Sequence, residues 1–334
     1  MCRASSSGRG SPQHHRSYHG PVTASPPTDR RAVPAAEWTP TDREREHEPA
    51  VVRGMAGLAA LLVTCILVAA GAYLMFVRTR WGQSVDQAVL QGRDVADGRT
   101  RHAAARILQT ISVGSLALGA LGLAFIGVLR NRWRLALAVL TSVMGAVITT
   151  ELLKKVILTR PELVAGQLYP VNSLPSGHTT VATALAAGLV LVAPHRYRAA
   201  AVIVGTLYAG GVGVSNVVLA AHRPSDIVAG YAVAVGWAAG VALLLALVHR
   251  TRPAPPPTPT VESAVVLLLA LGAAAMALLI VVAWVLRIEQ DALGLVPFGR
   301  AFVVSILSLG AAAFGLLAAL GIVLRPVTLD THEG

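Results

Sequence analysis

From residue 54 onward, the chain is dominated by long apolar stretches that charged residues rarely interrupt. A helix needs roughly 20 apolar residues to cross the hydrocarbon core of a bilayer. The sequence therefore predicts eight candidate membrane-spanning helices, over residues 54–77, 107–129, 135–153, 179–194, 199–221, 227–248, 263–286 and 301–324. Glu151, near the end of the third stretch, is the one Asp, Glu, Lys or Arg among them.

This pattern predicts an all-α polytopic membrane protein of about eight transmembrane helices. A soluble fold would have to bury eight unusually apolar helices. Residues 1–53 are rich in Ser, Pro, Arg and His without an apolar period, and we expect them to form a disordered tail. A proline-rich linker at 251–262 separates a predicted six-helix domain, residues 54–250, from a two-helix C-terminal extension at 263–334. On the sixth span, Gly236 and Gly240 have the spacing that lets two helices approach closely in lipid.

Composition supports the membrane interpretation. The chain is 54% hydrophobic and 13% charged, whereas soluble domains carry about 25% charged residues. The net charge is +11, and the basic residues cluster in short connections between spans, where they meet anionic lipid headgroups. This placement disfavours a nucleic-acid partner. Cys2 lies in the tail and Cys65 inside the first span, so we expect no disulfide framework.

Lys and Arg residues in the connections indicate how the chain is oriented in the membrane. The two sides carry 11 and 12 of them, or 11 and 8 when the four in the candidate site described below are left out. Because cytoplasmic connections are enriched in Lys and Arg, the candidate site is predicted on the outer side. The first span starts too late for an ordinary secretory signal peptide, so we expect it to remain as an anchor.

The chemically informative residues fall in three connections that an even number of crossings places on one side. The third span is followed by Lys154, Lys155 and Arg160, and Pro161 predicts that the helix stops near Arg160. Pro-Ser-Gly-His precedes the fourth span, and His-Arg-Pro-Ser-Asp opens the sixth. Histidines, an aspartate, a serine and several cations are therefore predicted to share one layer near the headgroups.

Part of this set suits a phosphate group. Lys154 and Arg160 supply fixed positive charge for an anion with two or more negative charges. Ser176 and Gly177, just before a predicted helix, offer a hydroxyl, free backbone N–H groups and room for close approach. Simpler interpretations stay open, because Lys154 and Lys155 can extend to the interface from a helix end and Ser176 can serve as an N-cap alone.

The histidines suit phosphoryl transfer. His222 and Asp226 are four positions apart, so the carboxylate can accept a hydrogen bond from one imidazole nitrogen while the other attacks phosphorus. His178 has no such partner in the sequence and is the better proton donor to the departing oxygen. A metal site is disfavoured, since carboxylates are few and Lys and Arg repel cations.

The order of Lys…Arg-Pro, then Pro-Ser-Gly-His, then Ser…His-x-x-x-Asp resembles the type 2 phosphatidic acid phosphatase superfamily. This superfamily includes membrane lipid phosphatases and is related to vanadium haloperoxidases, and the resemblance covers residues 107–248. It implies that His222 is the nucleophile of a phosphohistidine intermediate, that Asp226 orients it and that His178 protonates the leaving group. The resemblance also implies a set of phosphate-binding residues, namely Lys154, Arg160, Ser176 and the Gly177 N–H group.

Two departures from the superfamily pattern stand out. The first motif usually has six residues between Lys and Arg-Pro, whereas five lie between Lys154 and Arg160. The third motif usually begins Ser-Arg, whereas this chain has Ser215 and Asn216. A neutral amide removes a full charge and a bidentate donor. We hypothesise that Arg223, beside the expected nucleophile, supplies the missing phosphate contact.

The resemblance implies a membrane-embedded lipid phosphate or pyrophosphate phosphatase that needs no metal or other cofactor. Expected substrates include polyprenyl pyrophosphate, phosphatidylglycerol phosphate, phosphatidate and phosphorylated prenyl sugars. The expected location is the outer face of a bacterial cytoplasmic membrane, with membrane lipids as the surroundings. Three alternatives stay open: a lipid-linked phosphotransferase with the same site, a scaffold with a decayed site, and a transporter, although ionisable groups at span ends disfavour transport.

Overall fold

The computed structural model of the protein describes residues 42–165, 171–249 and 297–325. Within these ranges all regular structure is helical. The longer helices are, in chain order, α1 (Asp42–Ala72), α2 (Arg80–Gln91), α3 (Gly98–Gln109), α4 (Val113–Leu129), α5 (Trp133–Leu152), α6 (Gly177–Val192), α7 (Arg198–Val218), α8 (Pro224–His249) and α10 (Pro297–Val323). Short π-helical or 3₁₀ turns extend four of them, namely η1 (Tyr73–Val77), η2 (Gly92–Val95), η3 (Leu153–Ile157) and η4 (His195–Tyr197).

Five of the described helical segments are long and apolar enough to cross a membrane, and they contain α1, α5, α7, α8 and α10. The bent pair α3–α4 makes a sixth if it is counted as one span, and α6 is a shorter apolar helix. The prediction of an all-α polytopic membrane protein is thereby confirmed. The predicted seventh span, 263–286, lies outside the described residues, as do the linker and most of the predicted tail.

The predicted second span, 107–129, is interrupted in the structure. α3 ends at Gln109, α4 begins at Val113, and the two helices meet at an angle of 62°. Ser112 caps α4, because its hydroxyl accepts the Ser115 N–H at 3.1 Å while the Ser115 hydroxyl accepts the Ser112 N–H at 2.8 Å. This reciprocal capping box starts a new helix inside the apolar stretch.

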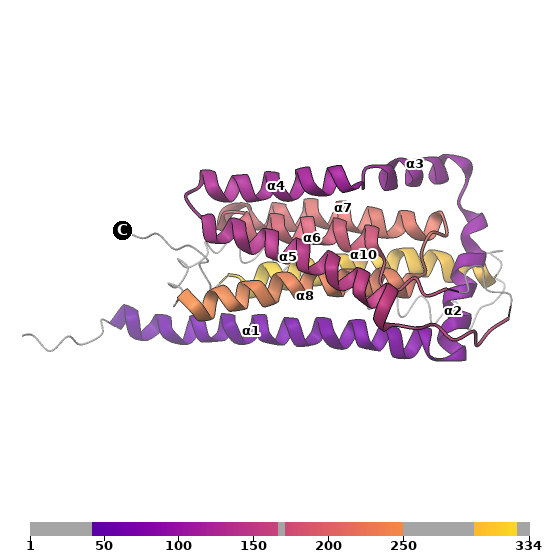
Figure 1. Ribbon diagram of the computed structural model, residues 1–334, viewed down its shortest axis with the longest axis horizontal. Coiled ribbons are helices and arrows are strands. Elements are labelled where there is room, and N and C mark those ends of the chain that lie inside the picture. The colour runs from indigo at the N-terminus through magenta and orange to yellow at the C-terminus, as the bar shows by residue number, and fades with distance from the viewer. Residues whose placement is uncertain (1–41, 166–170, 250–296, 326–334) are drawn as a thin grey trace, which may run out of the picture. The chain divides into compact units, whose positions relative to one another are not determined.

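α1 also departs from the expectation, since it begins at Asp42, inside the stretch predicted as a tail. Glu and Arg residues are good helix formers, so a helix that starts from an apolar span readily extends through them. On its apolar part, α1 packs along α8 (Figure 1). The predicted close approach of Gly236 occurs here, because a Cβ atom at that position would lie 3.2 Å from the Cβ of Cys65.

α8 and α10 both contribute to the main hydrophobic core. α8 packs against α1, α5 and α6, and α10 packs against α7 and α8. From α10, Leu309, Leu317 and Leu320 are buried in this cluster. The predicted division into a six-helix domain and a C-terminal extension stays a prediction, because the chain between α8 and α10 lies outside the described residues.

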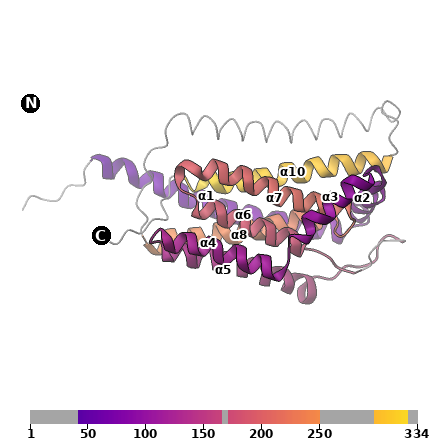
Figure 2. The same ribbon diagram turned by 90° about the horizontal axis from the view of Figure 1, so that it is seen from above.

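α2 has no counterpart among the predicted spans, since it falls in the stretch 78–106 that the sequence indicated as a connection. It runs across one end of the bundle, and both views place it at the same end as α3 (Figures 1 and 2). The candidate site lies at the start of α8, next to α2. α2 is thus placed to support residues that the sequence indicated as functional.

Candidate active site

Four segments that are distant in sequence border one pocket: the turn before α4 with the start of that helix, the end of α5, the start of α6 and the turn before α8. The pocket has a volume of about 420 Å³. Its polar wall consists of Ser112, Thr150, Glu151, Lys154, Gly177, His178, Thr180 and His222. Its apolar wall consists of Ile111, Val113, Leu116, Val147 and Val181. A cation, two histidines and a helix N-terminus therefore border the same space as an apolar surface.

The two adjacent lysines of the first motif have different environments. Lys154 lines the pocket, and a Cβ atom built on Gly177 would lie 3.6 Å from its Nζ atom. Lys155 instead forms an ion pair with Glu151 at 2.6 Å and is largely exposed. Lys154 is therefore the lysine placed to meet a bound anion.

Ser176 and Gly177 occupy the N-terminus of α6, as the sequence indicated. The Ser176 hydroxyl is fully buried and acts as the N-cap, accepting hydrogen bonds from the Thr179 N–H at 3.4 Å and the Thr179 hydroxyl at 3.1 Å. Gly177 lines the pocket and Ser176 does not. The capping role thus accounts for Ser176 structurally, while its phosphate-binding role stays a prediction.

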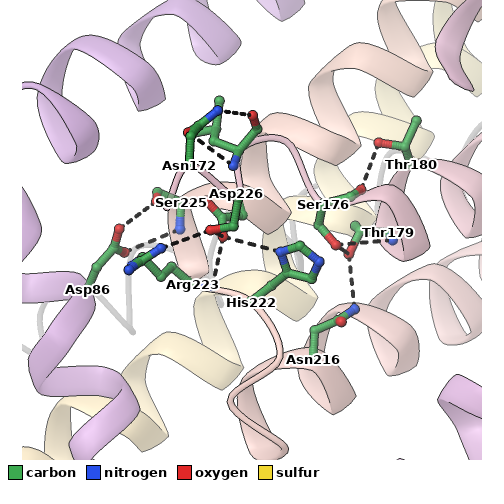
Figure 3. A network of polar contacts seen from close by, with 12 residues as sticks. Asp86, Asn172, Ser176, Thr179, Thr180, Asn216, His222, Arg223, Ser225 and Asp226 are labelled. Carbon is green, nitrogen blue, oxygen red and sulfur yellow. Dashed lines mark hydrogen bonds and ion pairs between the residues drawn. The ribbon is translucent and has the colours of Figure 1, made fainter. Parts of the chain in front are cut away.

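His222 and Asp226 face one another in the turn before α8 and in its first turn. The His222 Nδ1 atom lies 3.3 Å from the Asp226 Oδ2 atom (Figure 3). The same oxygen accepts the Ser173 hydroxyl at 2.6 Å and the Arg223 backbone N–H at 3.0 Å. Asp226 is completely buried and His222 is partly exposed to the pocket. With Nδ1 turned to the carboxylate, the other ring nitrogen is left for a substrate.

Asn216, where the superfamily pattern usually has an arginine, is fully buried. Its backbone carbonyl accepts the N–H groups of Ala221 at 2.8 Å and His222 at 3.3 Å. Its side-chain amide donates to the Thr179 hydroxyl and to the Val212 carbonyl. Asn216 therefore ties the turn that carries His222 to the start of α6.

Residues 135–253 match the family model of the PAP2 superfamily. The resemblance to this superfamily is thereby confirmed for that segment. The match supports a phosphatase, and all three motifs lie inside it. Among solved structures, one described as the crystal structure of the first transmembrane PAP2 type phosphatidylglycerolphosphate phosphatase from Bacillus subtilis is similar to this chain. The identity is 21% and the TM-score 0.47, over 58% of this chain and 98% of that chain. No match was found among curated proteins.

Arg160 of the first motif and Arg223, the arginine next to His222, are not among the residues that line the pocket. Arg223 is almost completely buried, and its guanidinium donates to the Ser173 hydroxyl at 2.8 Å. Burial and the nearby Arg223 charge lower the pKa of Arg160, while Asp86 and Asp226 act in the opposite direction. The two guanidinium groups concentrate positive charge close to the His222–Asp226 pair.

Asp86 is a site neighbour that sequence reasoning missed, and it lies outside the segment matched by the PAP2 model. Its carboxyl is buried and accepts the Ser225 hydroxyl at 2.6 Å (Figure 3). Burial and the charge of Asp226 raise the pKa of Asp86 to about 7, although Ser225 and Arg160 oppose the shift. In the sequence Asp86 is one of three aspartates in a connection rich in arginine, and nothing distinguishes it from a solvated one.

Metal ligands are not grouped in the part of the chain that the structure describes. Within those residues, no set of three or more His, Cys, Asp or Glu side chains is arranged to hold a metal ion. Of the carboxylates around the site, Asp226 faces His222 and Ser173, and Glu151 pairs with Lys155.

Proposed function

We propose that the protein is a membrane-embedded phosphatase of lipid phosphates or pyrophosphates that works through a phosphohistidine intermediate without a metal ion. The observation that carries the proposal is the pairing of His222 with the buried Asp226, since His222 borders one pocket with His178 and Lys154. A nucleophile aimed by a buried carboxylate, a second imidazole and a fixed cation are the components that phosphoryl transfer requires.

In the first step, the free ring nitrogen of His222 attacks phosphorus and the bond from phosphorus to the leaving oxygen breaks. His178 gives its proton to that oxygen, so the lipid alcohol or lipid phosphate departs in protonated form. Asp226 accepts the hydrogen bond from Nδ1 and stabilises the positive charge that develops on the ring. The product is a phosphohistidine at residue 222 and a neutral His178.

In the second step, a water molecule attacks the phosphohistidine and His178 takes its proton. The bond from nitrogen to phosphorus breaks, inorganic phosphate leaves, and His222 and His178 return to their starting protonation states. Lys154 and the Gly177 N–H group stabilise the phosphoryl oxygens from the pocket wall, with Arg160, Ser176 and Arg223 proposed as further phosphate-binding residues. Such positioned positive charge is usually the largest contribution to this chemistry.

The apolar wall of the pocket supports a lipid as substrate. Ile111 precedes α4, Val113 and Leu116 lie at its start, and all three face the same space as the histidines. The proposed substrates are polyprenyl pyrophosphate, phosphatidylglycerol phosphate, phosphatidate and phosphorylated prenyl sugars. The protein is an integral membrane protein, and we place its site on the outer face of a bacterial cytoplasmic membrane.

The test is phosphate release by the full chain, purified in detergent, from a panel of these four lipids with EDTA present. The unaltered protein and a His102→Ala control, which changes an exposed histidine on α3, are expected to release phosphate. His222→Ala is expected to release none. Equal release by His222→Ala would overturn the nucleophile assignment, and loss of activity with EDTA would overturn the metal-free mechanism. Phosphate that reaches an added alcohol instead of water would identify a phosphotransferase.

A further inference from the structure

α2 places two polar side chains in the protein interior beside the candidate site. Gln83 is 0% and Asp86 1% exposed. Burial of such groups is costly unless they are hydrogen-bonded. They are three positions apart and so lie on one face of the helix, and α2 as a whole lies outside residues 135–253. Their hydrogen bonds show what this face of α2 holds in place.

Asp86 contacts the start of α8. Its Oδ2 atom accepts the Ser225 hydroxyl at 2.6 Å and its Oδ1 atom accepts the Ser225 backbone N–H at 3.4 Å (Figure 3). The first N–H groups of a helix have no partner within the helix, and Asp86 supplies one from another segment. Ser225 directly precedes Asp226, so this contact fixes the helical turn from which Asp226 orients His222.

Gln83 contacts the loop that carries Arg160. Its Nε2 atom donates to the carbonyl of Pro161 at 2.8 Å and to that of Val77 at 2.7 Å. Its Oε1 atom accepts the Leu163 N–H at 3.2 Å. The single side-chain amide of Gln83 therefore joins the end of the first span, at Val77, to the backbone of Pro161 and Leu163 in the loop.

The position of α2 is itself fixed by local sequence. The Thr79 hydroxyl caps the helix by accepting the Gly82 N–H at 3.0 Å. A Cβ atom at residue 82 would overlap the Met75 carbonyl oxygen, so glycine is required for this close approach of α2 to the end of the first span. α2 is therefore held against the bundle end on one side and holds the two motif segments on the other.

We propose that Gln83 and Asp86 are positioning residues for catalysis, which together set the Arg160 loop against the His222–Asp226 pair. This inference rests on the proposed phosphatase function. Asp86 acts on the nucleophile through Ser225, and Gln83 acts on phosphate binding through the Pro161 loop. Loss of the Asp86 contact therefore lowers kcat, whereas loss of the Gln83 contacts raises KM.

The experiment is a double-mutant cycle on the full chain in detergent, with phosphate release from the panel lipid that the unaltered protein hydrolyses fastest. Asp86→Ala and Ser225→Ala are each expected to lower kcat about tenfold to a hundredfold, the range for a misplaced catalytic group. The double variant is expected to have a kcat no lower than that of the less active single variant, because both substitutions remove the same contact. Gln83→Ala is expected to raise KM about tenfold with a smaller change in kcat.

Two further variants separate positioning from a general loss of packing. Asp86→Asn keeps an acceptor for Ser225 and is expected to restore kcat to within about threefold of the unaltered protein. Gln87→Ala, which removes another buried polar side chain from α2, is expected to leave kcat and KM unchanged. Ser225→Ala removes only a hydroxyl, so it tests the same contact if Asp86→Ala does not fold.

Three results would overturn the inference: a kcat of Ser225→Ala equal to that of the unaltered protein, additive losses in the double variant, or an equal loss in Gln87→Ala. Failure of the proposed phosphatase function would give different results. The unaltered protein would then release no phosphate from any panel lipid, or His222→Ala would release as much phosphate as the unaltered protein.

Discussion

The side-chain amide of Asn216 donates a hydrogen bond to the Thr179 hydroxyl at 3.3 Å, and a second one to the Val212 carbonyl at 3.0 Å. The first of these joins the last turn of α7 to the first turn of α6. Because the backbone carbonyl of Asn216 also accepts the His222 N–H group, one residue links the two segments that carry the histidines. At this position the chain has a structural connection where the superfamily pattern has a charge.

Substitution of Asn216 should therefore affect stability through its donors. Asn216→Ala removes the hydrogen bonds and is expected to cost about 1–3 kcal/mol in the free energy of unfolding. Asn216→Asp has nearly the same shape, but its carboxylate cannot donate to the Val212 carbonyl and is charged in a fully buried place, so it is expected to be less stable than the alanine variant. The midpoint of thermal unfolding in detergent measures both. An aspartate variant as stable as the alanine variant would contradict this interpretation of the contact.

The proposed role of His178 predicts a dependence on the leaving group. His178→Asn is expected to lower kcat about 10²- to 10⁴-fold for a lipid phosphate, whose alkoxide must be protonated as it departs. With p-nitrophenyl phosphate, whose phenolate leaves without a proton, the loss should be much smaller. His222→Ala should abolish turnover of both substrates, since it removes the nucleophile. An equal loss for both substrates in His178→Asn would argue against a general acid at this position.

The adjacent lysines provide a matched comparison. Lys154 lines the pocket, whereas Lys155 pairs with Glu151 on an exposed surface. Lys154→Ala is expected to lower kcat/KM about tenfold to a hundredfold, because a hydrogen bond to a charged group contributes about 1.5–3 kcal/mol. Lys155→Ala should stay within about fivefold of the unaltered protein, as expected for an exposed ion pair. Steady-state kinetics on one lipid substrate decides, and a reversed order would show that the other lysine binds phosphate.

The positions of most long apolar helices and the order of the motifs were predictable from the sequence because each depends on local patterns. The apolar runs indicated the long helices, and Pro224 indicated where α8 begins, since proline suits the first turn of a helix. His222, His178 and Lys154 were indicated by their place at the span ends, and they border one pocket. The choice between Lys154 and Lys155 was not predictable, because it depends on the π-helical turn η3 that ends α5.

Contacts between distant segments could not be read from the sequence. Gln83 and Asp86 look like ordinary polar residues of a connection, and only the placement of α2 across the bundle end buries them. The departure at Asn216 was visible as a missing arginine, but its partner Thr179 was not, since the two belong to different helices. In both cases the deciding information is tertiary, and no periodicity or motif encodes it.

The raised pKa of Asp86 predicts a specific dependence of stability on pH. Burial and the Asp226 charge raise this pKa from its usual 3.8 to about 7, against the opposing effects of Ser225 and Arg160. Between these two values the folded protein binds more protons than the unfolded chain, so this residue makes the free energy of unfolding fall as pH rises from about 4 to 7 and stay level above. The Asp86→Asn variant lacks this contribution, because an amide does not titrate.

The measurement is the thermal unfolding midpoint of both proteins in detergent at several pH values between 5 and 8. The midpoint of Asp86→Asn minus that of the unaltered protein is expected to increase across this range and to level off above about pH 7. Other carboxylates, including Asp226 and Glu151, titrate in both proteins, and their effects largely cancel in the difference. A difference that does not change with pH would show that Asp86 is ionised throughout. Because a neutral carboxyl and an amide both accept the Ser225 hydroxyl, the same variant should keep its activity while losing this pH dependence.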